Sequence, residues 1–184
     1  MTEPALVGLE VAGDADAWRA AGFGPHGDVV RLGAVDMVVG VGQGGIASWD
    51  VTAEPRPRLL WAPAHPNGAN ALDHLVVFTD DPVRTTSKYE AMGLHRRRVR
   101  EIGNGRTQTF FRAGEPIIEL VGPIPDMHGE QFWGLAITVD DLDACAALLG
   151  DKLGRVKDAV QPGRRIATLR HEACGLTVPI AFMS

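Results

Sequence analysis

The chain repeats one pattern of elements, first over residues 72–123 and again over residues 132–184. Each copy begins with a short apolar run that leads into two aspartates, Asp80-Asp81 in the first copy and Asp140-Asp141 in the second. An aspartate before a helical pattern is a common N-cap, and Pro82 suits a first helical position. Three strand-like runs follow each helix. The repeat therefore predicts two βαβββ modules in an α+β fold.

Each predicted helix ends at a turn that contains glycine. The two turns are Met92-Gly93-Leu94 and Leu153-Gly154-Arg155. Glycine is favoured there because the residue after a helix often adopts a left-handed backbone conformation.

Residues 1–52 contain a fainter copy of the same pattern. We expect strands at 6–12, 28–32, 35–41 and 46–51, with a short helix at 14–21. Residues 53–71 hold four prolines and are predicted to form a linker, because proline lacks a backbone donor and restricts the preceding residue. Within it, His65-Pro66-Asn67-Gly68 is interpreted as rigid linker, with a lid over a pocket as the alternative. The predicted domains are thus a degenerate N-terminal module (1–52), a linker (53–71) and a paired-module domain (72–184).

Composition narrows the function classes. The 184 residues carry a net charge of −5, which argues against a nucleic-acid surface. No apolar run approaches the roughly 20 residues that span a bilayer, and the N-terminus lacks the positive start of a signal peptide. We therefore predict a cytoplasmic protein that binds neither nucleic acid nor membrane. Cys145 and Cys174 are expected to be buried reduced thiols.

Two polar residues stand out within apolar strands of the first module, namely His74 and Glu119. Side chains alternate across a strand. In the strand expected just before the one that contains Glu119, one face should therefore carry Gln108 and Phe110, and the opposite face Phe111. Glu119 needs a partner because an unpaired buried carboxylate is costly. A salt bridge to Arg106 or Arg112 of the neighbouring strand would give Glu119 such a partner.

The run His95-Arg96-Arg97-Arg98-Val99-Arg100 is interpreted as a solvated strand. Alternation places Arg96, Arg98 and Arg100 on one face, and the alternative is that one of them points inward to hold an anionic substrate. The aromatic pair Phe132-Trp133 is either core or the lining of a site for a flat organic ligand.

Residues 72–184 resemble the vicinal oxygen chelate superfamily, which includes glyoxalases, bleomycin-resistance proteins and extradiol dioxygenases, and residues 6–52 resemble it faintly. The resemblance rests on the runs 72–77, 93–94, 108–112 and 118–123. It implies modules whose strands curve into an open cup, with His74 and Glu119 matching one pair of ligands to a divalent metal ion. It also implies Glu119 as the candidate catalytic residue. The candidate ligand-binding residues are His74, Gln108, Phe110, Arg112 and Phe132.

The second module departs from this pattern. Aligning the two modules sets Gly134 opposite His74 and Pro179 opposite Glu119, and neither can bind a metal through its side chain. His171 or Glu130 could reach the cup instead, so the cofactor is either a divalent metal ion or none.

Two hypotheses for the function follow. The first is a glyoxalase-like protein that binds a small organic molecule in the cup, with catalysis left open. The alternative is a divalent-metal-dependent lyase, isomerase or dioxygenase acting on vicinal oxygens. A homodimer is expected if the N-terminal unit pairs with its copy in a second chain; otherwise this unit covers the outside of the cup.

Overall fold

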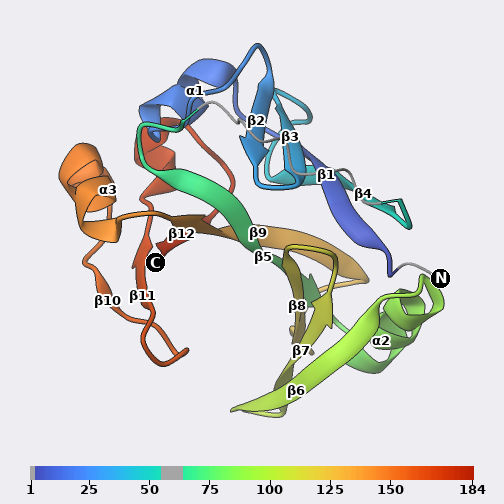
Figure 1. The fold of residues 1–184 in the computed structure, drawn as a ribbon. Coiled ribbons are helices and arrows are strands. Elements are labelled where there is room, and N and C mark those ends of the chain that lie inside the picture. The colour runs from blue at the N-terminus through green and yellow to red at the C-terminus, as the bar shows by residue number, and fades with distance from the viewer. Residues whose placement is uncertain (1–2, 55–63) are drawn as a thin grey trace.

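A computed structural model describes residues 3–54 and 64–184 and gives an α+β fold built mostly from strands (Figure 1). Within these described residues, three α-helices and two 3-10 helices accompany the strands of two sheets. The N-terminal elements are β1 (Ala5–Val11), α1 (Ala15–Ala20), β2 (Val29–Leu32), β3 (Val35–Val39) and β4 (Ile46–Thr52). The first module contains β5 (Ala69–Thr79), α2 (Pro82–Ala91), β6 (His95–Gly103), β7 (Arg106–Arg112) and β8 (Ile117–Gly122). The second contains β9 (Glu130–Val139), α3 (Leu142–Leu149), η1 (Gly150–Lys152), β10 (Lys157–Asp158), β11 (Arg165–Thr168), η2 (His171–Cys174) and β12 (Ile180–Met183).

The two modules share one eight-stranded sheet, in the order β10-β11-β12-β9-β5-β8-β7-β6. Its two central strands, β5 and β9, run antiparallel, with Leu75 directly opposite Leu135. Each central strand pairs in parallel with the last strand of its own module, β8 or β12. The sheet bends, so that β10 and β11 at one edge and β6 at the other rise on the same, concave side (Figure 1).

Capping residues set the ends of the helices much as the sequence predicts. The Asp81 carboxylate accepts hydrogen bonds from the first turn of α2, and Asp141 does the same for α3. Gly93 has a φ of 88° just beyond α2, as expected for a C-terminal turn. The predicted end of the second helix was wrong: α3 stops at Leu149, and η1 fills the interval up to the predicted turn.

The N-terminal unit has the predicted elements but its own pairing. Its sheet has the order β2-β3-β1-β4, in which β1 pairs with β3 in parallel and with β4 antiparallel. In both modules the first strand pairs in parallel with the fourth. The N-terminal copy is therefore similar in element order only.

This unit lies against the convex side of the large sheet (Figure 1). The Trp49 ring on β4 contacts the rings of Tyr89 and Phe132, each at 5.3 Å between centroids. Phe23, which follows α1, contacts Phe182 on β12 at 5.8 Å. One continuous core runs through both sheets, so the N-terminal unit covers the outside of the cup.

The end of the predicted linker is fastened to the N-terminal unit. Nδ1 of His65 accepts a hydrogen bond from the Gly24 backbone N–H at 2.9 Å, and Nε2 is 2.7 Å from the Arg31 carbonyl oxygen. The buried Asn67 amide donates to the Ala21 carbonyl. Residues 55–63 of the predicted linker lie outside the described residues, and β5 begins at Ala69 rather than Leu72. Among the described helices, none has the length and apolar character needed to cross a membrane.

Candidate functional site

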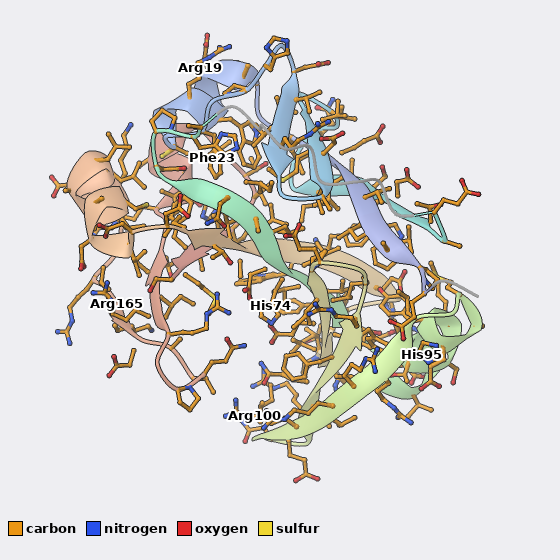
Figure 2. The ribbon with its side chains drawn as sticks, in the orientation of Figure 1. Arg19, Phe23, His74, His95, Arg100 and Arg165 are labelled. Atoms are coloured by element: carbon orange, nitrogen blue, oxygen red, sulfur yellow. The ribbon has the colours of Figure 1, made fainter. Side chains whose placement is uncertain are left out.

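His74 and Glu119 lie on the same face of two adjacent strands. On β5, Leu75 and Val77 are fully buried in the core, so His74 and Val76 point to the opposite, concave side. Val76 is directly opposite Glu119 of β8, which makes His74 and Glu119 diagonal neighbours on that side. Figure 2 shows His74 on the concave side of the sheet. The two residues singled out in the sequence therefore come together.

A β-bulge adds a third side chain to this face. Leu72 pairs with Ile137 and His74 with Ala136, so Asp73 is an extra residue in β5. A bulge turns two successive side chains toward the same face, and Asp73 accordingly contacts His74. Asp73 is not predicted from the sequence, because regular alternation would place its side chain on the other face.

Asp73 is held in a network of donors. Its Oδ2 contacts Nδ1 of His74, in a geometry nearer an ion pair than a well-directed hydrogen bond. Its Oδ1 forms an ion pair with Arg164 at 2.8 Å and accepts from the Thr138 hydroxyl at 3.3 Å. Burial by itself raises the pKa of Asp73, but His74 and Arg164 outweigh burial and lower the pKa to about 2. Asp73 is therefore a carboxylate at neutral pH.

Glu119 has a different environment. Its Oε1 accepts a hydrogen bond from the Gln108 amide at 2.5 Å, instead of either predicted salt bridge. Burial raises the pKa of Glu119, while the charge of His74, the Gln108 amide and the charge of Arg100 oppose that rise. The two carboxyl groups on this face thus differ, because Asp73 stays ionised and Glu119 takes up a proton more readily.

Most of the predicted ligand-binding residues share the concave face. Phe110 is directly opposite Glu119, and its ring contacts His74 edge-on at 6.3 Å. Arg112, opposite Ile117, lies on the same side and is exposed. Phe132 does not join them, because it faces the convex side and contacts Trp49.

Trp133 takes the place that was expected for Phe132. Val76 pairs with Gly134 and Val77 with Phe132, so Trp133 is an extra residue in β9. Its ring stacks on that of Phe78, which shares the concave face with His74, at 5.1 Å. This second bulge occupies the same place in its module as the bulge at Asp73.

The pairing registers define which residues of the two modules are equivalent. His74 and Gly134 are equivalent about the Leu75–Leu135 pair, as the sequence alignment indicated. Glu119 pairs with Val76 as Ala181 pairs with Ala136, so the equivalent of Glu119 is Ala181. The assignment of Pro179 to that place was wrong by two residues.

A family model described as the Glyoxalase/Bleomycin resistance protein/Dioxygenase superfamily matches residues 71–171, which is more than half of the chain. The chain belongs to this superfamily. The matched region contains both bulges and the His74–Glu119 pair, and it excludes the N-terminal unit.

Comparison with solved structures finds similarity to two methylmalonyl-CoA epimerases. Methylmalonyl-CoA epimerase from Mycobacterium tuberculosis is 20% identical, with 67% of this chain and 91% of that chain covered and a TM-score of 0.53. A Streptomyces coelicolor methylmalonyl-CoA epimerase, solved in complex with 2-nitronate-propionyl-CoA, is 23% identical, with 61% and 94% covered and a TM-score of 0.47. A comparison with curated proteins finds no match.

The superfamily implies a divalent metal, but the residues of this member do not fit one. His74 and Glu119 are the two donors of the first module, whereas the equivalent places in the second hold Gly134 and Ala181. Within residues 3–54 and 64–184, no three His, Cys, Asp or Glu side chains are grouped for a metal ion. Neither predicted substitute reaches the site: Glu130 binds Lys88 of α2, and His171 belongs to η2, which packs against α1.

Proposed function

We propose that the concave face of the large sheet binds a small organic molecule, and that His74 and Glu119 contact it. The observation that supports this proposal most directly is the environment of the His74 ring. His74 is only 5% exposed. Asp73 occupies its Nδ1, and its Nε2 makes no hydrogen bond to any residue in the described parts of the chain. Nε2 is not among the fully enclosed unpaired side-chain atoms of the described residues, so a partner that the chain itself does not supply can reach it.

The arrangement is suited to proton transfer. Nδ1 of His74 carries the proton, because two lone pairs facing each other across the Asp73 contact would repel. Nε2 is then the basic nitrogen, and Asp73 stabilises the imidazolium that forms when it takes a proton from a bound molecule. Glu119, with its raised pKa, lies diagonally beside His74 and can return a proton to the same molecule.

The other half of the concave face suits the apolar body of such a molecule. Two small apolar side chains, Ala136 and Ala181, lie there, and the Trp133 ring stacks on Phe78 on the same side. Phe110 lies beside His74 on the polar half. A flat or aromatic molecule with one polar end would match both halves.

A ligand screen with matched variants tests this proposal. Small molecules that raise the melting temperature of the wild type should lose at least tenfold in affinity in His74→Ala and in Glu119→Gln. The controls are His26→Ala, at an exposed residue of the N-terminal unit, and Glu101→Gln, at an exposed β6 residue that pairs with Thr107 on the convex side; both should leave affinity unchanged. Circular dichroism verifies that each variant is folded. Hits that bind all four variants equally would contradict the proposal.

A further inference from the structure

The arginines of β6 divide between the two faces of the sheet. Arg96 pairs with Phe111 and Arg98 with Phe110, so a bulge at Arg97 breaks the expected alternation. Arg96 contacts Glu90 of α2 on the convex side, and Arg97 binds Glu3. The prediction that Arg96 shares a face with Arg98 and Arg100 was therefore wrong.

Arg98 and Arg100 point to the concave side. They are directly opposite Phe110 and Gln108, two residues of the candidate site. Neither forms an ion pair with any residue of the described chain, although both neighbours on the other face are paired. Figure 2 places Arg100 on the edge strand, with His74 farther in along the sheet.

The β6–β7 part of the concave face is positively charged, although the whole chain is negatively charged. The protein carries a net charge of −5. On this part of the concave face, however, four arginines lie on two adjacent strands without an ion-pair partner among the described residues; they are Arg98, Arg100, Arg106 and Arg112. Like charges on neighbouring strands repel, so an anion placed among them would be attracted strongly.

We propose that Arg98 and Arg100 hold an anionic group, such as a carboxylate, sulfonate or phosphate, of the molecule that the concave face binds. This inference rests on the proposed function and names the class of its ligand. Two strand spacings, about 10 Å, separate β6 from β8. The anionic end would thus lie toward the sheet edge, while the reacting part of the same molecule lies against His74 and Glu119. Guanidinium groups suit this role because they bind such anions through two parallel hydrogen bonds.

Two fluorescent dyes of the same shape test the charge requirement. 8-Anilino-1-naphthalenesulfonate carries a sulfonate, and N-phenyl-1-naphthylamine is the same aromatic framework without it. Titrations with the full chain compare wild type, Arg98→Gln/Arg100→Gln and the matched control Arg96→Gln/Arg97→Gln, which removes two charges from the same strand. His74→Ala reports whether the dyes occupy the proposed site.

We expect the sulfonate dye to bind wild type more tightly than the neutral dye. The Arg98→Gln/Arg100→Gln variant should lose at least tenfold for the sulfonate dye and nothing for the neutral dye, while the control keeps both affinities. Salt should weaken sulfonate binding in wild type and in the control alone. Equal affinities for both dyes, or equal losses in both double variants, would overturn the charge inference but leave the binding site intact. Dye binding that is absent, or unaffected in His74→Ala, would overturn both proposals.

Discussion

At the level of single residues, two β-bulges determine which side chains meet on the concave face. One turns Asp73 to the same side as His74, and the other turns Trp133 to the same side as Gly134. The bulges occupy equivalent places, yet the first produces a contact between Asp73 and His74 and the second an aromatic group beside a glycine. The same backbone feature thus gives the two modules different chemistry.

Replacing Asp73 by Asn should destabilise the protein in a pH-dependent way. The pKa of Asp73 is about 2 in the folded state against an ordinary 3.8. Because the folded pKa is depressed, this carboxylate stabilises the fold above pH 3.8, and the stabilisation is lost as pH falls through 2. We expect Asp73→Asn to lose about 2 kcal/mol at pH 7 and the gap to wild type to close near pH 2.

Urea unfolding at pH 7, 4 and 2.5 would check this expectation. Asp143→Asn is the matched control, because Asp143 also binds an arginine, Arg165, but on the surface. Its loss should be small, since solvent and salt screen exposed ion pairs. A constant gap between Asp73→Asn and wild type over the whole pH range would contradict the linkage.

Glu119→Gln should leave the fold as stable as wild type or make it more stable at pH 7, while it weakens ligand binding. Burial raises the folded pKa of Glu119, so its contribution to stability is present below pH 4.5 and declines as pH rises through the folded pKa. Glutamine resembles the protonated acid, so the variant avoids the free-energy cost of burying an ionised carboxylate at pH 7. Melting temperatures at pH 7 and pH 4 measure the effect, which should vanish at pH 4; a lower melting temperature than wild type at pH 7 would refute it.

Alternation alone predicts much of the candidate site. Period-two spacing put Gln108 and Phe110 on one face of β7, and the structure shows that Glu119 of β8 shares that face. Asp73 and Trp133 were missed because a bulge shifts all later side chains by one place, and its position depends on a partner strand distant in sequence.

At the level of elements, the sequence predicted where helices begin more reliably than it predicted which strands pair. Asp81 and Asp141 cap helices through hydrogen bonds within three residues, so the sequence specifies them locally. The element order of the N-terminal unit does not specify that β1 pairs with β3 in parallel and with β4 antiparallel. The N-terminal unit was therefore predicted as a worn copy of the module, although its topology differs.

The segment before β5 should make the fold sensitive to mild acid. Burial lowers the pKa of His65, opposed by its bond to the Arg31 carbonyl, and Nδ1 must stay unprotonated to accept from the Gly24 N–H. The unfolded chain binds a proton near pH 6.5 while the folded chain resists it, so stability falls as pH drops below 6.5. His65→Ala should cost about 1–3 kcal/mol at pH 7.5, because a donor and an acceptor lose their partner.

Unfolding free energies at pH 7.5, 6 and 5 would separate the effect of protonating His65 from the effects of protonating other histidines. The wild type and the exposed control His95→Ala should both lose stability as pH falls, whereas His65→Ala should show a flatter profile. A wild-type profile no steeper than that of His65→Ala would contradict the argument.

At the level of the whole molecule, the large sheet carries the candidate site and the N-terminal sheet covers its convex side. The candidate site lies on the concave face of the large sheet, and the convex face packs against the helices and the N-terminal unit. An apolar convex face left open would favour association, so coverage by the N-terminal unit removes one reason to dimerise. The homodimer predicted from sequence stays a prediction.

Because one core joins both sheets, truncating Phe23 should weaken the entire molecule in a single step. Phe23 is 1% exposed, and its ring contacts those of Trp18 at 5.2 Å and Phe182 at 5.8 Å. Phe23→Ala should cost about 3–5 kcal/mol, and unfolding followed by tryptophan fluorescence and by circular dichroism should remain one coincident transition. Val160→Ala, at a residue 77% exposed, should change little. If the transition of Phe23→Ala splits, with residues 64–184 unfolding later, the N-terminal unit is a separate cooperative unit and the shared core does not couple the sheets.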